Sequence, residues 1–370
     1  MLEHIYSISQ TIAAFVVVIS VIVFIHEFGH YIVAKWCGVK ILAFSLGFGR
    51  EIVGWNDKSG TRWKISALPL GGYVKMFGDS SEASNPDTNK LAAMSEQERK
   101  VAFHHKKLWQ KSLIVLAGPA FNFLLSTVIF AGFILTNGLP STEPVAGKIL
   151  PNSAAQEAGL QVGDRITSVD GKKVYSFNDI PYYISTNLDT PVALVVERGE
   201  QRLEITLTPK QVEDDDGLGN KVIRPLIGIG SQKIEYKDVG LASAVIEASK
   251  RTYMTCETTL RVIGQMIMGK RDAKDMRGTI GIAQISGQAA EKGVSTVIWL
   301  IAIISANLGL MNLFPIPVLD GGHLVFYTIE AIFRRPLAEK VQEWSFRVGF
   351  SLIAMLMAFT LMNDVRRLAS

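Results

Sequence analysis

The stretch Phe24–Lys35, FIHEFGHYIVAK, places His26, Glu27 and His30 inside a strongly apolar run that begins near Ile12. His26 and His30 are four residues apart, so on a helix their side chains share one face and can bind one metal ion. Glu27 adjoins the first histidine and is placed to take a proton from metal-bound water. Ionisable residues within an apolar segment are costly, which favours a functional metal site over a polar helix end.

The composition is that of a membrane protein. The 370 residues are 48% hydrophobic and 19% charged, whereas soluble domains average about 25% charged residues. A net charge of +4, with no basic block interleaved with aromatic residues, gives no support for nucleic-acid binding. The two cysteines, Cys37 and Cys256, form neither a disulfide framework nor a zinc-knuckle spacing. Lipid-buried helices are therefore expected.

Four apolar segments approach the length of about 20 residues that a membrane-spanning helix needs. We expect them at about Ile12–Trp36, Ser112–Thr136, Ser295–Phe314 and Phe346–Met362. The first has neither the basic leader nor the cleavage site of a secretory signal, so we expect a mature helix. Lysine and arginine are concentrated between segments one and two and between three and four, which predicts that both links are cytoplasmic.

These segments divide the chain into seven expected parts. They are a first membrane helix with the metal motif (1–37), a cytoplasmic or membrane-associated β region (38–110), a second membrane helix (111–137), a soluble domain (140–210), a strand extension with an amphipathic surface helix (211–294), a third membrane helix (295–328) and a fourth (345–363). Alternating sequence predicts strands at Val192–Glu197 and Arg202–Leu207, and Asp170-Gly171 predicts a hairpin turn. Gly240–Gly269 is helical in pattern but too charged to span, which favours a helix on the membrane surface.

A catalytic zinc ion usually has three protein ligands and one open position, so a third ligand must come from elsewhere in the chain. Asp320, in MNLFPIPVLDGGH at the end of the third segment, is the main candidate. Pro315 and Pro317 break the helix there, and broken backbone at membrane depth can line a cavity. Asp320 could instead cap a helix or meet lipid headgroups. His323 is the competing ligand, and His104–His105, beside two lysines, is expected to be solvated.

Three further features could contact a substrate. Asn312 precedes Asp320 by about two helical turns and could donate a hydrogen bond to a substrate carbonyl, or could bond to a neighbouring helix. Asn122, in AGPAFNFLL of the second segment, has the same two interpretations. The stretch Thr61–Asp79, TRWKISALPLGGYVKMFGD, alternates like a β-strand. Its edge could hold an extended substrate by main-chain bonds, or it could be plain loop structure.

Together these motifs resemble those of the bacterial site-2 proteases, which are intramembrane zinc metalloproteases. HEFGH, LPLGGYVKM, AGPAFNF and NLFPIPVLDGGH follow one another in the family's order across nearly the whole chain. The similarity is to the group of the regulator of sigma-E protease, in a form with a single PDZ domain. It implies a polytopic α-helical membrane protein of about four transmembrane helices, with an inserted α/β PDZ domain in the periplasm and a membrane-associated β-element.

The resemblance also implies residue roles. His26, His30 and Asp320 would bind one Zn²⁺ per chain, and Glu27 would be the catalytic base. The residues expected beside the substrate are Asn312, Gly71, Gly72 and Tyr73.

The implied reaction is regulated intramembrane proteolysis of single-span membrane proteins, such as anti-sigma factors or remnant signal peptides. It would take place in the bacterial inner membrane, with the active site towards the cytoplasmic face. The expected partners are these transmembrane substrates and the lipid bilayer, without nucleic acid. The PDZ groove would bind an exposed C-terminal peptide or exclude bulky substrates. A metal transporter would leave Glu27 unexplained, and a non-catalytic PDZ adaptor would leave the intact metal motif unexplained.

Overall fold

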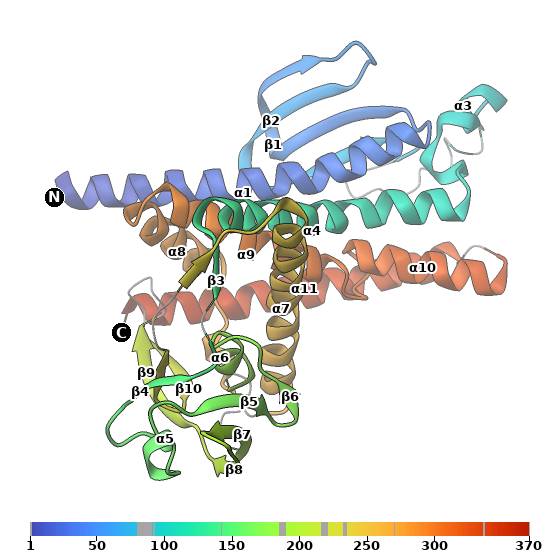
Figure 1. The fold of residues 1–370 in the computed structure, drawn as a ribbon. Helices are drawn as coiled ribbons and strands as arrows, with labels where there is room; N and C mark the ends of the chain where they lie inside the picture. The colour runs from blue at the N-terminus through green and yellow to red at the C-terminus, as the bar shows by residue number, and fades with distance from the viewer. Residues whose placement is uncertain are drawn as a thin grey trace. The chain divides into compact units, whose positions relative to one another are not determined.

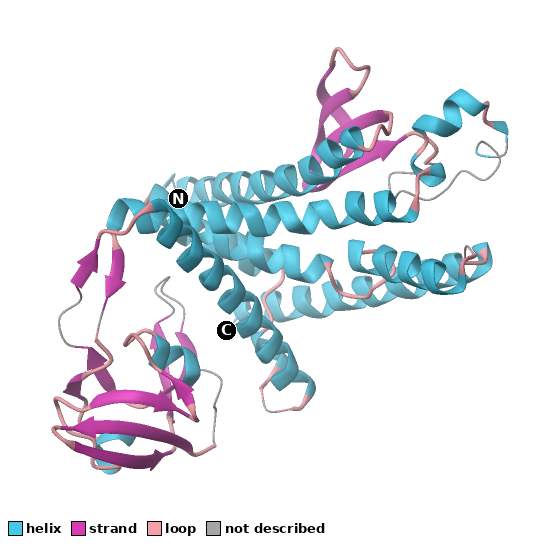
Figure 2. Cartoon of the chain, turned by 45° about the vertical axis from the view of Figure 1, so that its right-hand side comes forward, coloured by secondary structure: helices cyan, strands magenta, loops and turns pink. Residues whose placement is uncertain are grey.

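The computed structural model describes residues 2–79, 91, 93–141, 143–184, 190–215, 221–231, 235–269, 271–335 and 337–369. The chain divides into two compact units (Figure 1). The first contains Met1–Phe130 and Lys274–Ser370, and the second contains Ala131–Ala273. The first unit is mainly helical and carries one long hairpin, whereas the second is rich in strands (Figure 2).

Long helices make up most of the first unit. They are α1 (Leu2–Trp36), α4 (Leu108–Asn137, which continues into the second unit), α9 (Val294–Asn312) and α11 (Glu339–Ala369). Each holds a segment long and apolar enough to cross a membrane, at Ile8–Trp36, Leu108–Asn137, Val294–Asn312 and Lys340–Arg367. Four expected spanning helices are therefore confirmed by length and composition. Helices α1, α4 and α11 run past the expected ends because backbone hydrogen bonding continues through the polar flanks.

Shorter helices complete the helical part. They are α3 (Glu96–Val101), η1 (Phe103–His105), η2 (Ala273–Asp275), α8 (Thr279–Glu291) and α10 (Asp320–Phe333). Helix α8 lies in the region expected to hold a strand extension and a surface helix, and it packs along α1. Asp364 of α11 holds the start of α8, because its carboxylate accepts hydrogen bonds from the amides of Gly278 and Gly281, both at 3.0 Å.

Within the expected third part, 295–328, the chain forms two helices separated by the break that Pro315 and Pro317 predict. Helix α9 ends at Asn312, and helical structure resumes at Asp320, the first residue of α10. Pro315 and Pro317 lie in this break. Proline has no amide hydrogen and its ring obstructs the preceding turn, so an α-helix does not continue through the pair. The break puts Asp320 at the N-terminus of a new helix.

The hairpin of the first unit lies between α1 and α4 in the sequence. Strands β1 (Ile41–Asn56) and β2 (Arg62–Met76) pair antiparallel, with several register shifts. Its base shares a buried core with α1 and α4, to which Phe44 and Val74 belong. Strand β2 falls within the stretch predicted to be β. Strand β1 lies in the expected β region, 38–110, but its bounds were not predicted because three glycines interrupt its apolar pattern.

The second unit contains a four-stranded antiparallel sheet in the order β6-β5-β7-β8. Its strands are β5 (Arg165–Val169), β6 (Lys172–Lys173), β7 (Val192–Arg198) and β8 (Gln201–Leu207). Two short helices, α5 (Ala154–Glu157) and α6 (Asp179–Ile184), add side chains to the same core. The turn at Asp170-Gly171 has φ of 48° and 75°, as a two-residue hairpin of this type requires.

Three smaller strand pairs and a long helix complete the second unit. The pairs are β3 (Leu139–Ser141) with β12 (Glu235–Lys237), β4 (Ala146–Ile149) with β11 (Ile229–Ser231), and β9 (Lys210–Asp215) with β10 (Lys221–Leu226). Helix α7 (Leu241–Ile267) begins directly after Gly240, within the segment predicted to be helical.

Candidate metal centre and active site

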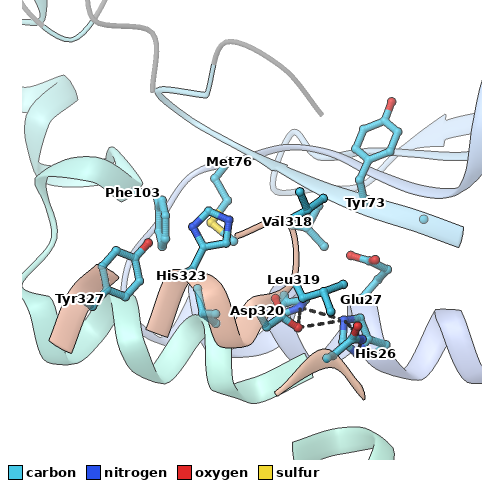
Figure 3. Close-up of a pocket in the computed structure, with 15 residues that line it drawn as sticks. His26, Glu27, Tyr73, Met76, Phe103, Val318, Leu319, Asp320, His323 and Tyr327 are labelled. Atoms are coloured by element: carbon cyan, nitrogen blue, oxygen red, sulfur yellow. Dashed lines mark hydrogen bonds and ion pairs between the residues drawn. The ribbon is translucent and has the colours of Figure 1, made fainter. Parts of the chain in front are cut away.

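A cavity of about 200 Å³ lies within the first unit (Figure 3). Its walls come from α1, strand β2, η1, α4, α9, α10 and the break before α10. His26, Glu27 and Asp320 lie at one end, and Phe103 and Tyr327 lie at the other (Figure 3). Segments that are some 290 residues apart in the sequence thus meet around one polar group.

Three nitrogen and oxygen atoms converge at the polar end. Nε2 of His26 lies 3.2 Å from Oδ2 of Asp320, and Nε2 of His30 lies 3.5 Å from the same oxygen. The two histidine nitrogens are 3.2 Å apart. Oδ2 of Asp320 is buried, and among the described residues it has no hydrogen-bond partner. Two buried imidazoles and a carboxylate are therefore aimed at one point, and they form a group able to hold a metal ion.

The spacing of these atoms fits zinc. Tetrahedral coordination at zinc–ligand distances of about 2.0–2.2 Å sets ligand atoms about 3.4 Å apart. The three separations of 3.2, 3.2 and 3.5 Å match that value. Two histidines with one carboxylate are also a known ligand set of catalytic zinc, one that leaves a position open for water or substrate.

His30 is oriented by helix α4. Its Nδ1 lies 2.8 Å from the backbone carbonyl oxygen of Ile114. A carbonyl accepts hydrogen bonds and does not donate them, so Nδ1 carries the ring proton and Nε2 keeps its lone pair for a metal. This contact depends on a close approach of α1 and α4, because a Cβ on Gly118 would collide with the His30 ring.

Glu27 lies beside the metal group and against strand β2. It lines the cavity, and Figure 3 shows its carboxylate on the side of His26 that faces the strand. A Cβ on Gly72 would stand 3.0 Å from Cγ of Glu27. The glycine therefore lets β2 pass directly over the acidic side chain.

Of the four residues expected beside a substrate, three line the cavity and one does not. The amide nitrogen of Asn312 lies 3.4 and 3.3 Å from Nδ1 and Nε2 of His26. Gly72 and Tyr73 line the cavity, although the Tyr73 ring points away from His26 and Asp320 (Figure 3). Gly71 does not line the cavity. A Cβ on Gly71 would meet the ring of Phe48 instead.

His323 and His104 contact neighbouring side chains outside the group of three ligands. His323 lines the cavity but is not one of the three grouped ligands, and its ring packs near Phe346. The expectation that His104 is solvated is wrong, because its Nε2 lies 2.9 Å from Oδ1 of the buried Asp79. Asp79 also accepts the amide of Met76 at 2.9 Å, so the pair fixes the end of β2. The partner of His104 is 25 residues away, and sequence spacing gave no signal for it.

A buried His–His–Asp group with a glutamate at its side, set among helices apolar enough to cross a membrane, defines a membrane metallopeptidase. The chain belongs to peptidase family M50, whose model matches residues 14–356. The resemblance drawn from the motifs is thereby confirmed.

Curated relatives match over nearly their whole length. The chain is 43% identical to "Putative zinc metalloprotease Atu1380" of Agrobacterium fabrum over 364 residues, covering 96% of each chain. It is 40% identical to "Putative zinc metalloprotease R01501" of Rhizobium meliloti, covering 97% of each. It is 36% identical to "Metalloprotease MmpA" of Caulobacter vibrioides, covering 95% of this chain and 94% of that one.

Among solved structures, the PDZ domain of the SdrC-like protein of Listeria monocytogenes matches 25% of this chain and 88% of its own, at 19% identity and a TM-score of 0.20. That score is too low to define a fold. The family and the curated relatives make this protein a zinc metalloprotease with Zn²⁺ as its cofactor. With its four apolar helices, it is a multi-pass bacterial membrane protein.

Proposed function

We propose that this chain is an intramembrane zinc metalloendopeptidase that cleaves single-span membrane proteins in regulated intramembrane proteolysis. The observation that carries the proposal is the buried group of His26, His30 and Asp320, with Glu27 beside it. Two of these ligands and the glutamate belong to a helix segment, Ile8–Trp36, that is apolar enough to lie in lipid.

The geometry of the group supports the following roles. His26, His30 and Asp320 would hold Zn²⁺, which would supply Lewis-acid chemistry to the scissile carbonyl and to a water molecule near neutral pH. Glu27 takes the proton of the attacking water and passes it to the leaving amide nitrogen. The amide of Asn312, close to the His26 ring, is placed to donate a hydrogen bond to the oxyanion.

The substrate lies against strand β2. The part of β2 from Gly72 to Met76 pairs on one side with Ile41–Leu46 of β1. Among the described strands no other strand pairs with β2, so the opposite edge of this part can add an extended peptide by main-chain hydrogen bonds. A transmembrane helix has its peptide groups paired internally and must unwind before cleavage. Strand addition provides replacement partners, and the close passage of Gly72 over Glu27 brings the unwound segment to the catalytic base.

The substrate class and the membrane setting rest on the resemblance to site-2 proteases. The proposed substrate is an anti-sigma factor or a remnant signal peptide. The proposed setting is the inner membrane, with the active site towards the cytoplasm. The second unit contributes a periplasmic PDZ domain that binds an exposed C-terminus or excludes bulky substrates.

Single cysteines at Lys58 and Gln201, in a chain lacking Cys37 and Cys256, test the orientation. An impermeant maleimide on spheroplasts should label position 201, and labelling of position 58 would reverse the topology.

Cleavage of a single-span reporter by the purified protein in proteoliposomes tests the function, with products mapped by mass spectrometry. We expect a cut within the span that a zinc chelator abolishes and added zinc restores. Cuts confined to the soluble parts of the reporter, with an intact span, would contradict intramembrane proteolysis.

A further inference from the structure

A buried polar chain links three helices behind the metal group. Asn122 of α4 is 0% exposed. Its amide nitrogen, Nδ2, lies 3.1 Å from Nδ1 of His26. Ser305 of α9 donates a hydrogen bond from Oγ to the backbone oxygen of Asn122 at 2.9 Å, and the same Oγ is 3.4 Å from Oδ1 of Asn122. The roles assigned to the catalytic residues leave both residues unused.

Hydrogen-bond accounting decides which way this amide must face. Its nitrogen and oxygen have nearly the same shape, so either can be turned towards His26. With the nitrogen towards the ring, Nδ1 must accept, and neutral His26 then carries its proton on Nε2, the atom that faces Asp320. With the oxygen towards the ring, Nδ1 donates and Nε2 keeps the lone pair that a metal needs.

The second orientation also satisfies Ser305. Its hydroxyl hydrogen stays on the backbone oxygen of Asn122, and its oxygen accepts from the amide nitrogen that has turned towards it. Burying a polar group without a partner costs about 1–3 kcal/mol, so an arrangement in which the serine, the amide and the imidazole are all paired is favoured.

We propose that Asn122, held by Ser305, is a positioning residue that keeps the proton of His26 on Nδ1 and so presents Nε2 to zinc. The proposal rests on His26 being a zinc ligand. Both histidines would then donate a hydrogen bond from Nδ1 and present Nε2 to the metal, since the Nδ1 proton of His30 is held by the carbonyl of Ile114. Asn312 does not serve this purpose, because its amide nitrogen is almost equally distant from both nitrogens of His26.

Two substitutions at position 122 separate this role from packing. Asn122→Asp keeps an oxygen that accepts the Nδ1 proton, whereas Asn122→Leu keeps the volume and removes the acceptor. Loss of an outer partner of a metal-binding histidine typically lowers metal affinity about 10–100-fold. We therefore expect the zinc dissociation constant, measured by competition with a chromogenic chelator on the full-length protein, to rise about 10–100-fold in Asn122→Leu and to stay within about threefold of wild type in Asn122→Asp.

Several results would overturn the proposal. An unchanged zinc dissociation constant in Asn122→Leu would do so, and so would a weakening in Asn122→Asp equal to that in Asn122→Leu. Ser305→Ala supplies a second route if either variant folds poorly. Made in the wild type, it should weaken zinc binding; made in Asn122→Leu, it should weaken zinc binding no further. Equal weakening in both backgrounds would mean that Ser305 does not act through Asn122.

Two controls separate this inference from the metal site itself. Asn363→Leu makes the same change at an asparagine that is 3% exposed and outside the cavity, and it should leave zinc affinity unchanged. His26→Ala should abolish stoichiometric zinc binding. If His26→Ala retains zinc, the assignment of the ligand fails; if it loses zinc while all Asn122 variants bind normally, the inference about Asn122 alone fails.

Discussion

Nδ1 of His30 lies 2.8 Å from the backbone carbonyl oxygen of Ile114, a residue 84 positions further along the chain. This contact ties helix α1 to helix α4 and turns Nε2 of His30 towards Asp320. It forms because Gly118, one turn beyond Ile114, leaves room for both histidine rings. The metal group thus depends on a glycine that carries no chemistry of its own.

Gly118→Ala should therefore damage the metal site without weakening its helix. The new Cβ would collide with Nε2 of His30 and lie 2.7 Å from Cε1 of His26. Alanine is favoured over glycine in a helix by about 1 kcal/mol, so lost helix propensity cannot account for a defect. We expect zinc affinity at least about tenfold weaker, by analogy with the loss of a ligand's support, and a matching loss of reporter cleavage.

Gly132→Ala is the matched control for that variant. It makes the same substitution in the same helix, at a position where a Cβ meets no heavy atom within 4 Å. It should bind zinc and cleave the reporter as wild type does. If the two alanine variants are indistinguishable, the close packing of α4 against the histidines is not required for the site.

Gly72→Ala should separate catalysis from metal binding. Its Cβ would stand 3.0 Å from Cγ of Glu27, 2.9 Å from Cγ1 of Val23 and 2.7 Å from the carbonyl oxygen of Ser45. Strand β2 or the glutamate must then shift, whereas the three metal ligands are not among these neighbours. We expect kcat to fall while zinc per chain, measured by atomic emission, stays constant. Normal kcat would show that β2 need not pass closely over the base.

The pH dependence of the second unit should report on Asp164. The Arg198 guanidinium donates hydrogen bonds of 2.7 Å to both carboxylate oxygens. These bonds lower the pKa of Asp164, against its burial, and the amide of Gln161 adds to the effect. A carboxyl whose pKa is lower in the folded state stabilises that state above its unfolded pKa, which is about 3.9. The stabilisation is lost as the pH falls below that value towards the lower folded pKa.

Hydrogen exchange of peptides from β5 and β7, corrected for the intrinsic rate at each pH, measures this contribution. Protection in the wild type should be steady from pH 7 to about pH 5 and decrease below about pH 4. Asp164→Asn should show weaker protection already at pH 7 and a shallower acid dependence. Equal protection in the two proteins at pH 7 would mean that the ion pair does not stabilise the unit.

The metal motif could be predicted from the sequence because its geometry is local. The four-residue spacing of His26 and His30 fixes one helix face whatever the rest of the chain does. Asp320 could be selected as a candidate because two prolines break an apolar run just before it. That it meets the histidines rather than capping a helix or facing lipid depends on packing between segments almost 300 residues apart, which spacing does not encode.

The supporting contacts could not be predicted for the same reason. Asn122 and His26 are 96 positions apart, and nothing in the sequence of α4 distinguishes a bond to a metal ligand from a bond to a neighbouring helix. The pairing of His104 with Asp79 was also hidden, because two lysines beside the histidine favoured an exposed loop. Strand β1 was obscured by its glycines, which permit the bulged register that the hairpin needs.

The most direct test of the proposed mechanism compares the wild type with Glu27→Gln, using cleavage of the single-span reporter and zinc content as paired measurements. Glutamine preserves the shape of the side chain but cannot take a proton, and general bases contribute about 10²–10⁴-fold to rate. We predict that cleavage falls by at least about 100-fold while about one zinc ion per chain is retained. Cleavage at the wild-type rate by a zinc-loaded Glu27→Gln protein would contradict the assignment of Glu27 as the base.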